Sequence, residues 1–504
     1  MLIKDWQNWL MEKRLIRGYF RARVLAILLL LFLICLGLGI YHSYKLMPEG
    51  LNYESQSYIV NSSDVNFLKD TTYDTNQKTR QSDQEIFDKM FSYVDSAEQY
   101  VLVDMFLFND FVGKNAKVYK NLSAGLTDKL IAKKKSKPDI RIDVIVDPIN
   151  TVYGGYASPQ LAALEQAGIN VIVVDLNPLR DDNPIYSSVW RLLFSWLGNS
   201  THGWLPHPFA NGGARVSLRS YLAMINFKAD HRKVFLADNQ GELVSIITSA
   251  NAHDASSANS NAALEIKGIF GQEVYKSEAA EAAMSGNSLQ PLPQNLLGTK
   301  PGANQYVKAS LLTEGQIRQA ALTDINNLRA GDQLGLAMFY LSDRPIIKAL
   351  LAAASRGVNI KIILDPSKDA FGYVKNGIPN RQVASELVKQ SNNKISVRWY
   401  ETSGEQFHTK FMLWTNEEAG TSGLIVGSAN FTKRNVGNFN LETDVRLSTK
   451  RGLGAAQAAI DYFNRLWTNP DGATYTVDYS KYQDDSWLKT WLYRFQEFTG
   501  LSSF

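Results

Sequence analysis

Two short stretches of this sequence place a histidine and a lysine two residues apart, His231 with Lys233 and His408 with Lys410. Each pair opens an apolar run that predicts a β-strand, and residues two apart on a strand share one face. An imidazole beside an ammonium group suits phosphate chemistry, because the cation holds the anion while the imidazole attacks phosphorus or moves a proton. A single His-x-Lys means little, but two copies in matched surroundings favour a catalytic site.

Each copy is followed by a second predicted strand that ends in a Ser-x-Asn pattern, and then by a glutamate 34 positions after the histidine. An aspartate, Asp238, follows the first pair, and Thr415 occupies the matching position of the second. The polar residues are Ser249, Asn251 and Glu265 in the first copy and Ser428, Asn430 and Glu442 in the second. We expect both sets to line one anion-binding site.

With HRKVFLAD in the first half and GSAN in the second, the chain resembles the phospholipase D superfamily. Members of this family carry two His-x-Lys-x-x-x-x-Asp motifs and build one active site where two halves meet. The resemblance covers about residues 82–467 and implies an α/β fold of two tandem α/β/α lobes forming one pseudo-symmetric unit. Thr415 departs from the family pattern, which leaves open the supporting role of that position in the second half.

The resemblance implies a reaction in two displacements through a phosphohistidine intermediate, with no metal or other cofactor. One histidine attacks phosphorus, and the other protonates the leaving alcohol and then activates water or an acceptor alcohol. The lysines and Ser-x-Asn groups would hold the phosphate oxygens, and Glu265 and Glu442 would each bond the far ring nitrogen of a histidine. We favour His231 as the nucleophile and His408 as the acid and base, with Asp238 in a supporting role.

The N-terminus predicts a membrane anchor. Val24 to Tyr41 contains no charged residue and is about long enough to cross a bilayer as a helix, and residues 1–23 before it are basic. The positive-inside rule then predicts a single-pass protein with a cytoplasmic N-terminus and an exported catalytic domain, as at a bacterial inner membrane. A cleaved signal peptide is the alternative, but its apolar core is normally shorter and no small-residue cleavage site follows. Cys35, the only cysteine, lies inside this run, so the exported part has no cysteine-based metal site.

Domain boundaries follow from composition. Residues 42–81 are polar and mostly without periodicity, which predicts a stalk between membrane and domain. Alternating strand and helix patterns then run twice, over 82–285 and 303–468, with a linker at 286–302. This alternation predicts parallel-type sheets covered by helices. An aromatic tail, 469–504, ends the chain.

Two aromatic-rich stretches lie outside the repeat, at 186–209 and in the tail from Trp487 to Phe504. Because Trp and Tyr favour the membrane–water interface, each stretch could touch the outer leaflet. The alternative is that both simply pack on the domain. Packing is the favoured interpretation for the tail, and the two interpretations are even for the first stretch.

The distribution of formal charge along the chain helps to decide between phospholipid and nucleic acid as the substrate. Residues 1–45 carry seven Lys and Arg against two Asp and Glu, so the rest of the chain has a formal charge of −1 although the whole is +4. A domain that grips nucleic acid usually has a basic excess, which argues against nucleic acid as a partner. The leading hypothesis is a membrane-anchored enzyme acting on phospholipid, either a phospholipase D or a cardiolipin synthase-like phosphatidyltransferase. A membrane-tethered endonuclease and a catalytically decayed envelope protein are the alternatives, and the head group, the acceptor and the oligomeric state stay open.

Overall fold

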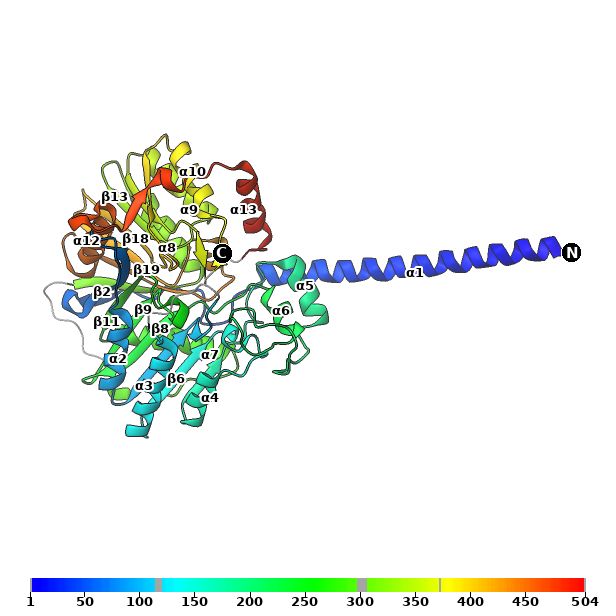
Figure 1. Ribbon diagram of the computed structural model, residues 1–504, viewed down its shortest axis with the longest axis horizontal. Coiled ribbons are helices and arrows are strands. Elements are labelled where there is room, and N and C mark those ends of the chain that lie inside the picture. Colours follow the sequence, from blue (N-terminus) through cyan, green and yellow to red (C-terminus); the bar gives the residue numbers. More distant parts are fainter. Residues whose placement is uncertain (1, 114–119, 297–305, 371–372, 503–504) are drawn as a thin grey trace.

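A long helix projects from a two-lobed body in the computed structural model (Figure 1), which describes residues 2–113, 120–296, 306–370 and 373–502. The projecting helix is α1 (Leu2–Tyr44), and each lobe is built on one large mixed sheet. The predicted linker falls partly on residues 297–302, which lie outside the described residues.

Lobe 1 is built on an eight-stranded sheet with the order β3-β2-β11-β9-β8-β4-β6-β7. Strands β4, β6 and β7 are parallel, and the other neighbours are antiparallel. Helices α2, α3 and α4 pack on one face and α7 on the other. The bounds are β2 (Val65–Asp74), β3 (Arg80–Asp83), α2 (Ile86–Ser96), β4 (Tyr100–Met105), α3 (Leu122–Ser136), β6 (Arg141–Val146), α4 (Pro159–Gln166), β7 (Asn170–Val173), β8 (Lys233–Asn239), β9 (Glu242–Thr248), β11 (Asn261–Lys267) and α7 (Phe270–Met284).

Lobe 2 is built on a nine-stranded sheet with the order β1-β12-β20-β19-β18-β13-β14-β17-β21. Helices α8, α9 and α10 cover one face, and α12 packs on the other. The bounds are β1 (Tyr58–Asn61), β12 (Tyr306–Thr313), α8 (Gly315–Asn327), β13 (Gln333–Met338), α9 (Arg344–Ser355), β14 (Asn359–Leu364), α10 (Asn380–Gln390), β17 (Ile395–Tyr400), β18 (Lys410–Asn416), β19 (Thr421–Gly427), β20 (Thr443–Lys450), α12 (Gly454–Thr468) and β21 (Thr476–Asp478).

The two sheets repeat one pattern, which confirms the predicted pair of α/β lobes. The series β2-β11-β9-β8-β4-β6-β7 of lobe 1 corresponds to β12-β20-β19-β18-β13-β14-β17 of lobe 2. Both inner faces, with α7 and α12, form one shared apolar core. The prediction of parallel-type sheets holds only for β4-β6-β7 and β13-β14-β17. The hairpins β8–β9 and β18–β19 are joined by short turns, and such turns require antiparallel pairing.

The prediction of a polar stalk at residues 42–81 is wrong. Within it, β1 pairs with β12 of lobe 2 and β2 pairs with β11 of lobe 1. Buried polar residues of β2 hydrogen-bond to other parts of the protein: Thr71 Oγ1 lies 3.1 Å from Tyr462 Oη, and Thr72 Oγ1 donates to the carbonyl of Ala258. Lobe 1 therefore starts near Val65, and only residues 45–57 separate α1 from the first strand.

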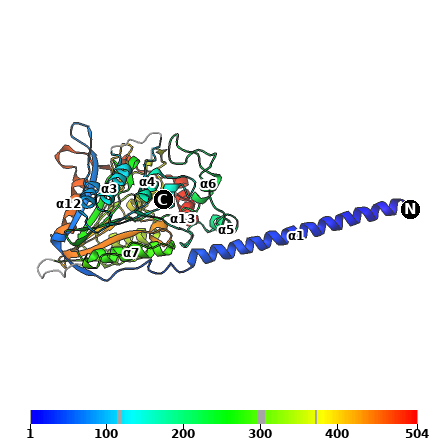
Figure 2. The same ribbon diagram turned by 90° about the horizontal axis from the view of Figure 1, so that it is seen from below.

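Short elements complete the body and form the side from which α1 projects. The predicted tail contributes β21 to the lobe 2 sheet and then forms a helix, α13. Figures 1 and 2 both place α5, α6 and α13 at the end of the body nearest α1. The bounds are β5 (Phe108–Asn109), α5 (Pro184–Leu193), α6 (Leu218–Met224), β10 (Ala252–His253), β15 (Asp369–Ala370), β16 (Tyr373–Val374), α11 (Lys433–Val436) and α13 (Trp487–Thr499).

Candidate active site

The two predicted histidines lie where the lobes meet. Two backbone bridges cross the boundary, Asp230 with Leu441 and Ser260 with Phe407. In the first, the backbone N–H of His231 donates to the carbonyl of Leu441 at 2.9 Å. These bridges set each histidine opposite the residue that follows the bridged residue of the other lobe: Glu442, after Leu441, for His231, and Asn261, after Ser260, for His408.

His231 is held by a carboxylate from the other lobe. Its Nδ1 lies 2.9 and 3.0 Å from the two oxygens of Glu442, and both side chains are buried. When Glu442 is ionised its carboxylate only accepts hydrogen bonds, so Nδ1 of His231 carries the proton and the lone pair on Nε2 is left free. Burial raises the pKa of Glu442 to about 7, against the opposing effects of Lys233 and hydrogen bonds from Asn435 and Ser428.

The partner of His408 is an amide, whereas the partner of His231 is a carboxylate. Its Nδ1 lies 3.3 Å from Oδ1 of Asn261. The amide is oriented by its own Nδ2, which donates to Asp70 and to the carbonyl of Asn259. His408 therefore also exposes Nε2, but without a negative charge behind the ring. The two halves share one geometry and differ in charge.

The lysines occupy equivalent places in the two lobes. Lys233 Nζ donates to the carbonyl of His231 at 2.6 Å, and Lys410 Nζ donates to that of His408 at 2.7 Å. Each ammonium also lies over an aromatic ring: Lys233 Nζ is 5.0 Å from the Phe106 centroid, and Lys410 Nζ is 5.3 Å from that of Phe339. The same rings pack against the histidines, with centroid separations of 4.9 and 5.0 Å.

The site is buried and strongly cationic. Burial first, and then the charges of both lysines, lower the pKa of His231 and of His408 well below the usual value. Burial lowers the pKa of Lys233 to about 8, and burial together with Lys233 holds the pKa of Lys410 well below its ordinary range. Two histidines and two lysines whose pKa values are lowered in this way form a site whose protonated groups a bound anion would stabilise.

Ser249 and Ser428 lie at the site but their hydroxyls point to the residues behind the histidines. Ser428 Oγ donates to Glu442 Oε2 at 2.5 Å, and Ser249 Oγ donates to Asn261 Oδ1 at 3.3 Å. Each hydroxyl also accepts a backbone N–H. The prediction that these hydroxyls hold phosphate is therefore not supported by their contacts, which instead position Glu442 and Asn261.

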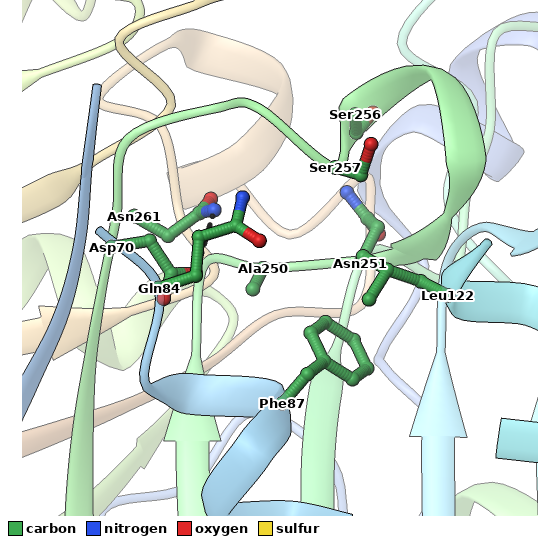
Figure 3. Close-up of a pocket in the computed structure, with 9 residues that line it drawn as sticks. All are labelled: Asp70, Gln84, Phe87, Leu122, Ala250, Asn251, Ser256, Ser257 and Asn261. Carbon is green, nitrogen blue, oxygen red and sulfur yellow. Dashed lines mark hydrogen bonds between the residues drawn. The ribbon is translucent and has the colours of Figure 1, made fainter. Parts of the chain in front are cut away.

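The two predicted asparagines are buried next to the serines. Asn251 Oδ1 accepts the backbone N–H of Leu107 at 3.2 Å, whereas Asn430 Oδ1 is buried and has no hydrogen-bond partner among the described residues. Asn251 lines a cavity of about 10 Å³, with Ser257 on its side and Asp70, Gln84 and Asn261 on the other (Figure 3). A space of that size holds about one water molecule, so this cavity is not the substrate pocket.

The predicted role of Glu265 is wrong. Its carboxylate accepts from Asn66 Nδ2 at 3.0 Å and lies near Lys89 and Lys267, away from either histidine. The strand register explains the error: the Ser249 N–H bonds the Ala262 carbonyl, and the Ser428 N–H bonds the Thr443 carbonyl. The counterpart of Glu442 is thus Asn261, which sequence analysis missed because the equal 34-residue interval pointed four positions too far.

Asp238 is a structural residue, as expected. Its carboxylate lies at the end of β8 remote from His231 and accepts the backbone N–H groups of Glu98, Gln99 and Tyr100. In lobe 2 the matching turn is held by Asp332, which accepts from the backbone of Arg329 and Glu417. In lobe 2, Asp332 thus makes backbone contacts of the kind that Asp238 makes in lobe 1. Thr415, at the position equivalent to Asp238, lies outside the catalytic geometry.

Two aspartates that end parallel strands hold the backbone before each histidine. Asp147 accepts the N–H of Asp230 at 2.7 Å, and Asp365 accepts that of Phe407 at 2.9 Å. The repeated Asp-Pro after β6 and β14 was the available sequence signal. Its function becomes apparent only when the strands are placed side by side.

A second group that sequence analysis missed is the buried acidic cluster beside His231. Arg232 is fully buried and contacts Glu278, Glu281 and Glu314 at 3.1, 3.3 and 2.7 Å. Oxygens of Asp104, Asp230 and Glu281 lie within 4.8 Å of one another, a spacing that could hold a hard cation. Burial and the nearby charge of Asp230 raise the pKa of Asp104 and of Glu281 well above the usual value, so bound protons and Arg232 neutralise the cluster.

Comparison with known proteins bears on this geometry. Residues 324–467 match the family described as "Cardiolipin synthase, PLD-like domain". The structure is similar to phosphatidylserine synthase from Haemophilus influenzae Rd KW20, with a TM-score of 0.55 and 10% identity over 88% of this chain and 95% of that one. A phospholipase D family member, Nuc from Salmonella typhimurium, has a TM-score of 0.25 and 21% identity over 32% of this chain and 94% of that one. A search of the curated proteins finds no match.

Proposed function

We propose that this chain, which belongs to the phospholipase D superfamily, is a membrane-anchored enzyme that transfers the phosphatidyl group of a phospholipid to water or to an alcohol. The observation that carries the proposal is the pairing of His231 with Glu442 and of His408 with Asn261 across the lobe boundary, beside two buried lysines. This arrangement has the groups that a two-step displacement at phosphorus requires.

In the first step, Nε2 of His231 attacks phosphorus and a P–N bond forms as the bond to the leaving alkoxide breaks. The negative charge of the bound phosphate favours the imidazolium form of His408, which gives its Nε2 proton to that alkoxide. In the second step, His408 takes a proton from water or an acceptor alcohol, whose oxygen displaces His231. Lys233 and Lys410 hold the non-bridging oxygens throughout.

The difference between the two histidine partners supports this division of roles. Attack on phosphorus leaves positive charge on the ring of the nucleophile, and Glu442 stabilises that charge through Nδ1 of His231. Asn261 offers His408 only an amide dipole, which leaves its imidazolium more acidic and a better proton donor.

The anchor is α1. Its segment Lys13–Tyr44 is long and apolar enough to cross a membrane and is almost wholly exposed. We propose that it keeps the catalytic body at the outer face of a bacterial inner membrane, with residues 1–23 in the cytoplasm. Tethering raises the effective concentration of lipid substrate at the site.

The test incubates full-length protein in detergent micelles with phosphatidylglycerol, with phosphatidylcholine and, separately, with a DNA oligonucleotide. Products are followed by mass spectrometry, with glycerol added as a competing acceptor. We expect phosphatidic acid, cardiolipin or a glycerol transfer product from lipid, and none from the His231→Ala or His408→Ala variants. Cleavage of the oligonucleotide with lipids untouched would contradict the proposal and favour an endonuclease. Wild-type protein that matches both variants on every substrate would favour a decayed site.

A further inference from the structure

The C-terminal end of the anchor helix packs directly on the body. Its last turns pack against α5, where Gly39 approaches Pro184 so closely that a Cβ there would lie 3.3 Å from the Pro184 carbonyl oxygen. In the last turn of the helix, the carbonyl of His42 accepts the N–H of Asp181, and just beyond the helix the carbonyl of Lys45 accepts from Arg180 Nε. Because Gly39 lies inside the apolar run that ends at Tyr41, α5 lies at the depth where that run leaves the hydrocarbon.

The outer face of α5 is apolar. Ile185, Val189 and Leu193 recur at intervals of four and form one exposed stripe, and Ile185 is 72% exposed. Trp196 extends the stripe past the end of the helix and is also 72% exposed. A soluble surface rarely leaves such a row open, whereas an interfacial helix presents one to lipid.

The outer face of α13 has the same character. Its inner face is fixed to lobe 2 by Tyr493, which is fully buried, and by Glu497. Trp491 and Phe495 stack with centroids 5.5 Å apart on the outside. The large apolar side chains left exposed are Trp487, Leu488, Trp491, Leu492, Phe495 and Phe498, and Phe498 is 83% exposed.

The two helices are far apart in sequence but joined in space. Arg434 bridges them: its guanidinium donates to the carbonyl of Gly500, just after α13, and lies 3.3 Å from Asp182, just before α5. Lys433 pairs with the same Asp182 at 2.6 Å. Figures 1 and 2 agree that α5 and α13 lie together at the end of the body from which α1 projects.

We propose that the outer faces of α5 and α13, with Trp196, form a single membrane-docking surface that lies in the interfacial layer of the leaflet that α1 enters. The occupant is the bilayer because α1 fixes α5 at the boundary of its own apolar run, and the Asp182–Arg434 contacts place α13 beside α5. Tryptophans and phenylalanines suit this layer, where one part of the side chain is apolar and another meets water.

The surface is mechanically linked to the candidate active site. Glu497, on the inner face of α13, accepts the hydroxyl of Ser342 at 2.8 Å and the backbone N–H of Lys433 at 2.9 Å. Lys433 follows Asn430, the end of the second Ser-x-Asn pattern, by three residues. Docking of α13 therefore fixes the loop that leads out of the lobe 2 half of the site relative to the lipid surface.

This inference rests on the proposed membrane anchor, and its test measures depth and needs no turnover. Full-length protein with Cys35→Ser receives one new cysteine, Trp491→Cys or Ile185→Cys, and is reconstituted into vesicles of phosphatidylethanolamine and phosphatidylglycerol. Each cysteine carries a nitroxide, and collision rates with oxygen and with a water-soluble nickel chelate are compared by electron paramagnetic resonance. The matched control is Asp461→Cys, exposed on α12 at the opposite end of the body.

We expect the labels at positions 491 and 185 to collide more with oxygen than with nickel, and the label at 461 to do the reverse. A label at 491 that behaves like the one at 461 would overturn the proposal for α13, whatever the enzyme assay gives. A second variant, Trp491→Ser with Phe495→Ser and Phe498→Ser, should lower turnover of vesicle lipid at least about tenfold and leave turnover of a short-chain, water-soluble phospholipid unchanged. Equal loss on both substrates would contradict a docking role.

Discussion

At the scale of single residues, the two halves of the site differ in one group. Glu442 and Asn261 occupy equivalent places, yet only Glu442 brings charge to a histidine. Around them the lobes match closely, from the lysine–carbonyl bonds to the aromatic ring packed on each imidazole. A pseudo-symmetric site can thus assign two distinct roles to two copies of one motif.

Replacing Glu442 by Gln should lower kcat about 100-fold or more, because the His231 ring loses the carboxylate that stabilises its positive charge. Glu265→Gln is the matched control, since Glu265 follows His231 by the same 34-residue interval that separates Glu442 from His408, but contacts neither histidine. Steady-state kinetics on phosphatidylglycerol would measure both. Equal losses in the two variants would contradict the assigned positions.

Substrate binding should weaken as the pH rises above about 8. Burial lowers the pKa of Lys233 to about 8, so this lysine loses its proton, and its attraction for phosphate, as the pH passes that value. Bound phosphate opposes the loss, so the effect appears in KM, which should rise between pH 7 and 9.5. A KM that stays flat over this range would show that the lysines do not bind the anion.

Sequence analysis identified the histidines and lysines that meet at the candidate site, but not the residues that hold them in place. His231, Lys233, His408 and Lys410 were identifiable because their types and spacing repeat. Asn261 was not, because its place depends on how β9 pairs with β11 in lobe 1, and a count along the chain cannot measure register.

At the scale of elements, the strands and their turns decide which residues can reach the site. The end of β8 remote from His231 is fixed by Asp238, and the ends of β6 and β14 hold the backbone before each histidine through Asp147 and Asp365. Hydrophobic patterns predicted the order of the strands along the chain, but they did not predict β2. Its buried threonines hydrogen-bond to groups far away in sequence, so a polar segment was mistaken for a stalk.

Asp238→Asn should destabilise the protein by about 2–4 kcal/mol, because a buried carboxylate that accepts three backbone N–H groups becomes a weaker, neutral acceptor. Turnover per folded molecule should be unchanged, since Asp238 is remote from the histidines. Urea unfolding and active-site-normalised kinetics would check the two effects. The Thr415→Ser variant is the control and should alter neither quantity. Lost turnover at full stability in Asp238→Asn would contradict the structural role.

At the scale of the whole molecule, the lobes are built to fold as one unit. Both inner sheet faces share a core, and Glu314 of lobe 2 accepts from Arg232 of lobe 1 while also accepting the backbone N–H of Glu442. The two His-x-Lys motifs differ at their middle residue, which is Arg232 in lobe 1 and Thr409 in lobe 2. The sequence repeat predicts the two-lobed fold, but it does not predict this buried ion pair between Arg232 and Glu314.

Arg232→Leu should destabilise the protein by about 3–5 kcal/mol, because three buried glutamates lose their guanidinium. Arg451→Gln removes a half-exposed surface pair with Glu417 and should change stability by less than about 1 kcal/mol. Denaturant unfolding of both variants in the same detergent compares them directly. Similar small losses in the two variants would show that the buried cluster does not join the lobes.

The central claim is that His231 attacks phosphorus in a site shared with His408, and trapping the intermediate tests it most directly. Full-length protein is mixed with phosphatidylglycerol in micelles, quenched within milliseconds in alkali, where P–N bonds survive, and its peptides are mapped by mass spectrometry. The account predicts a phosphatidyl adduct on His231 in the wild type and none in His231→Ala. An adduct on His408 or elsewhere, or full turnover by His231→Ala, would contradict it.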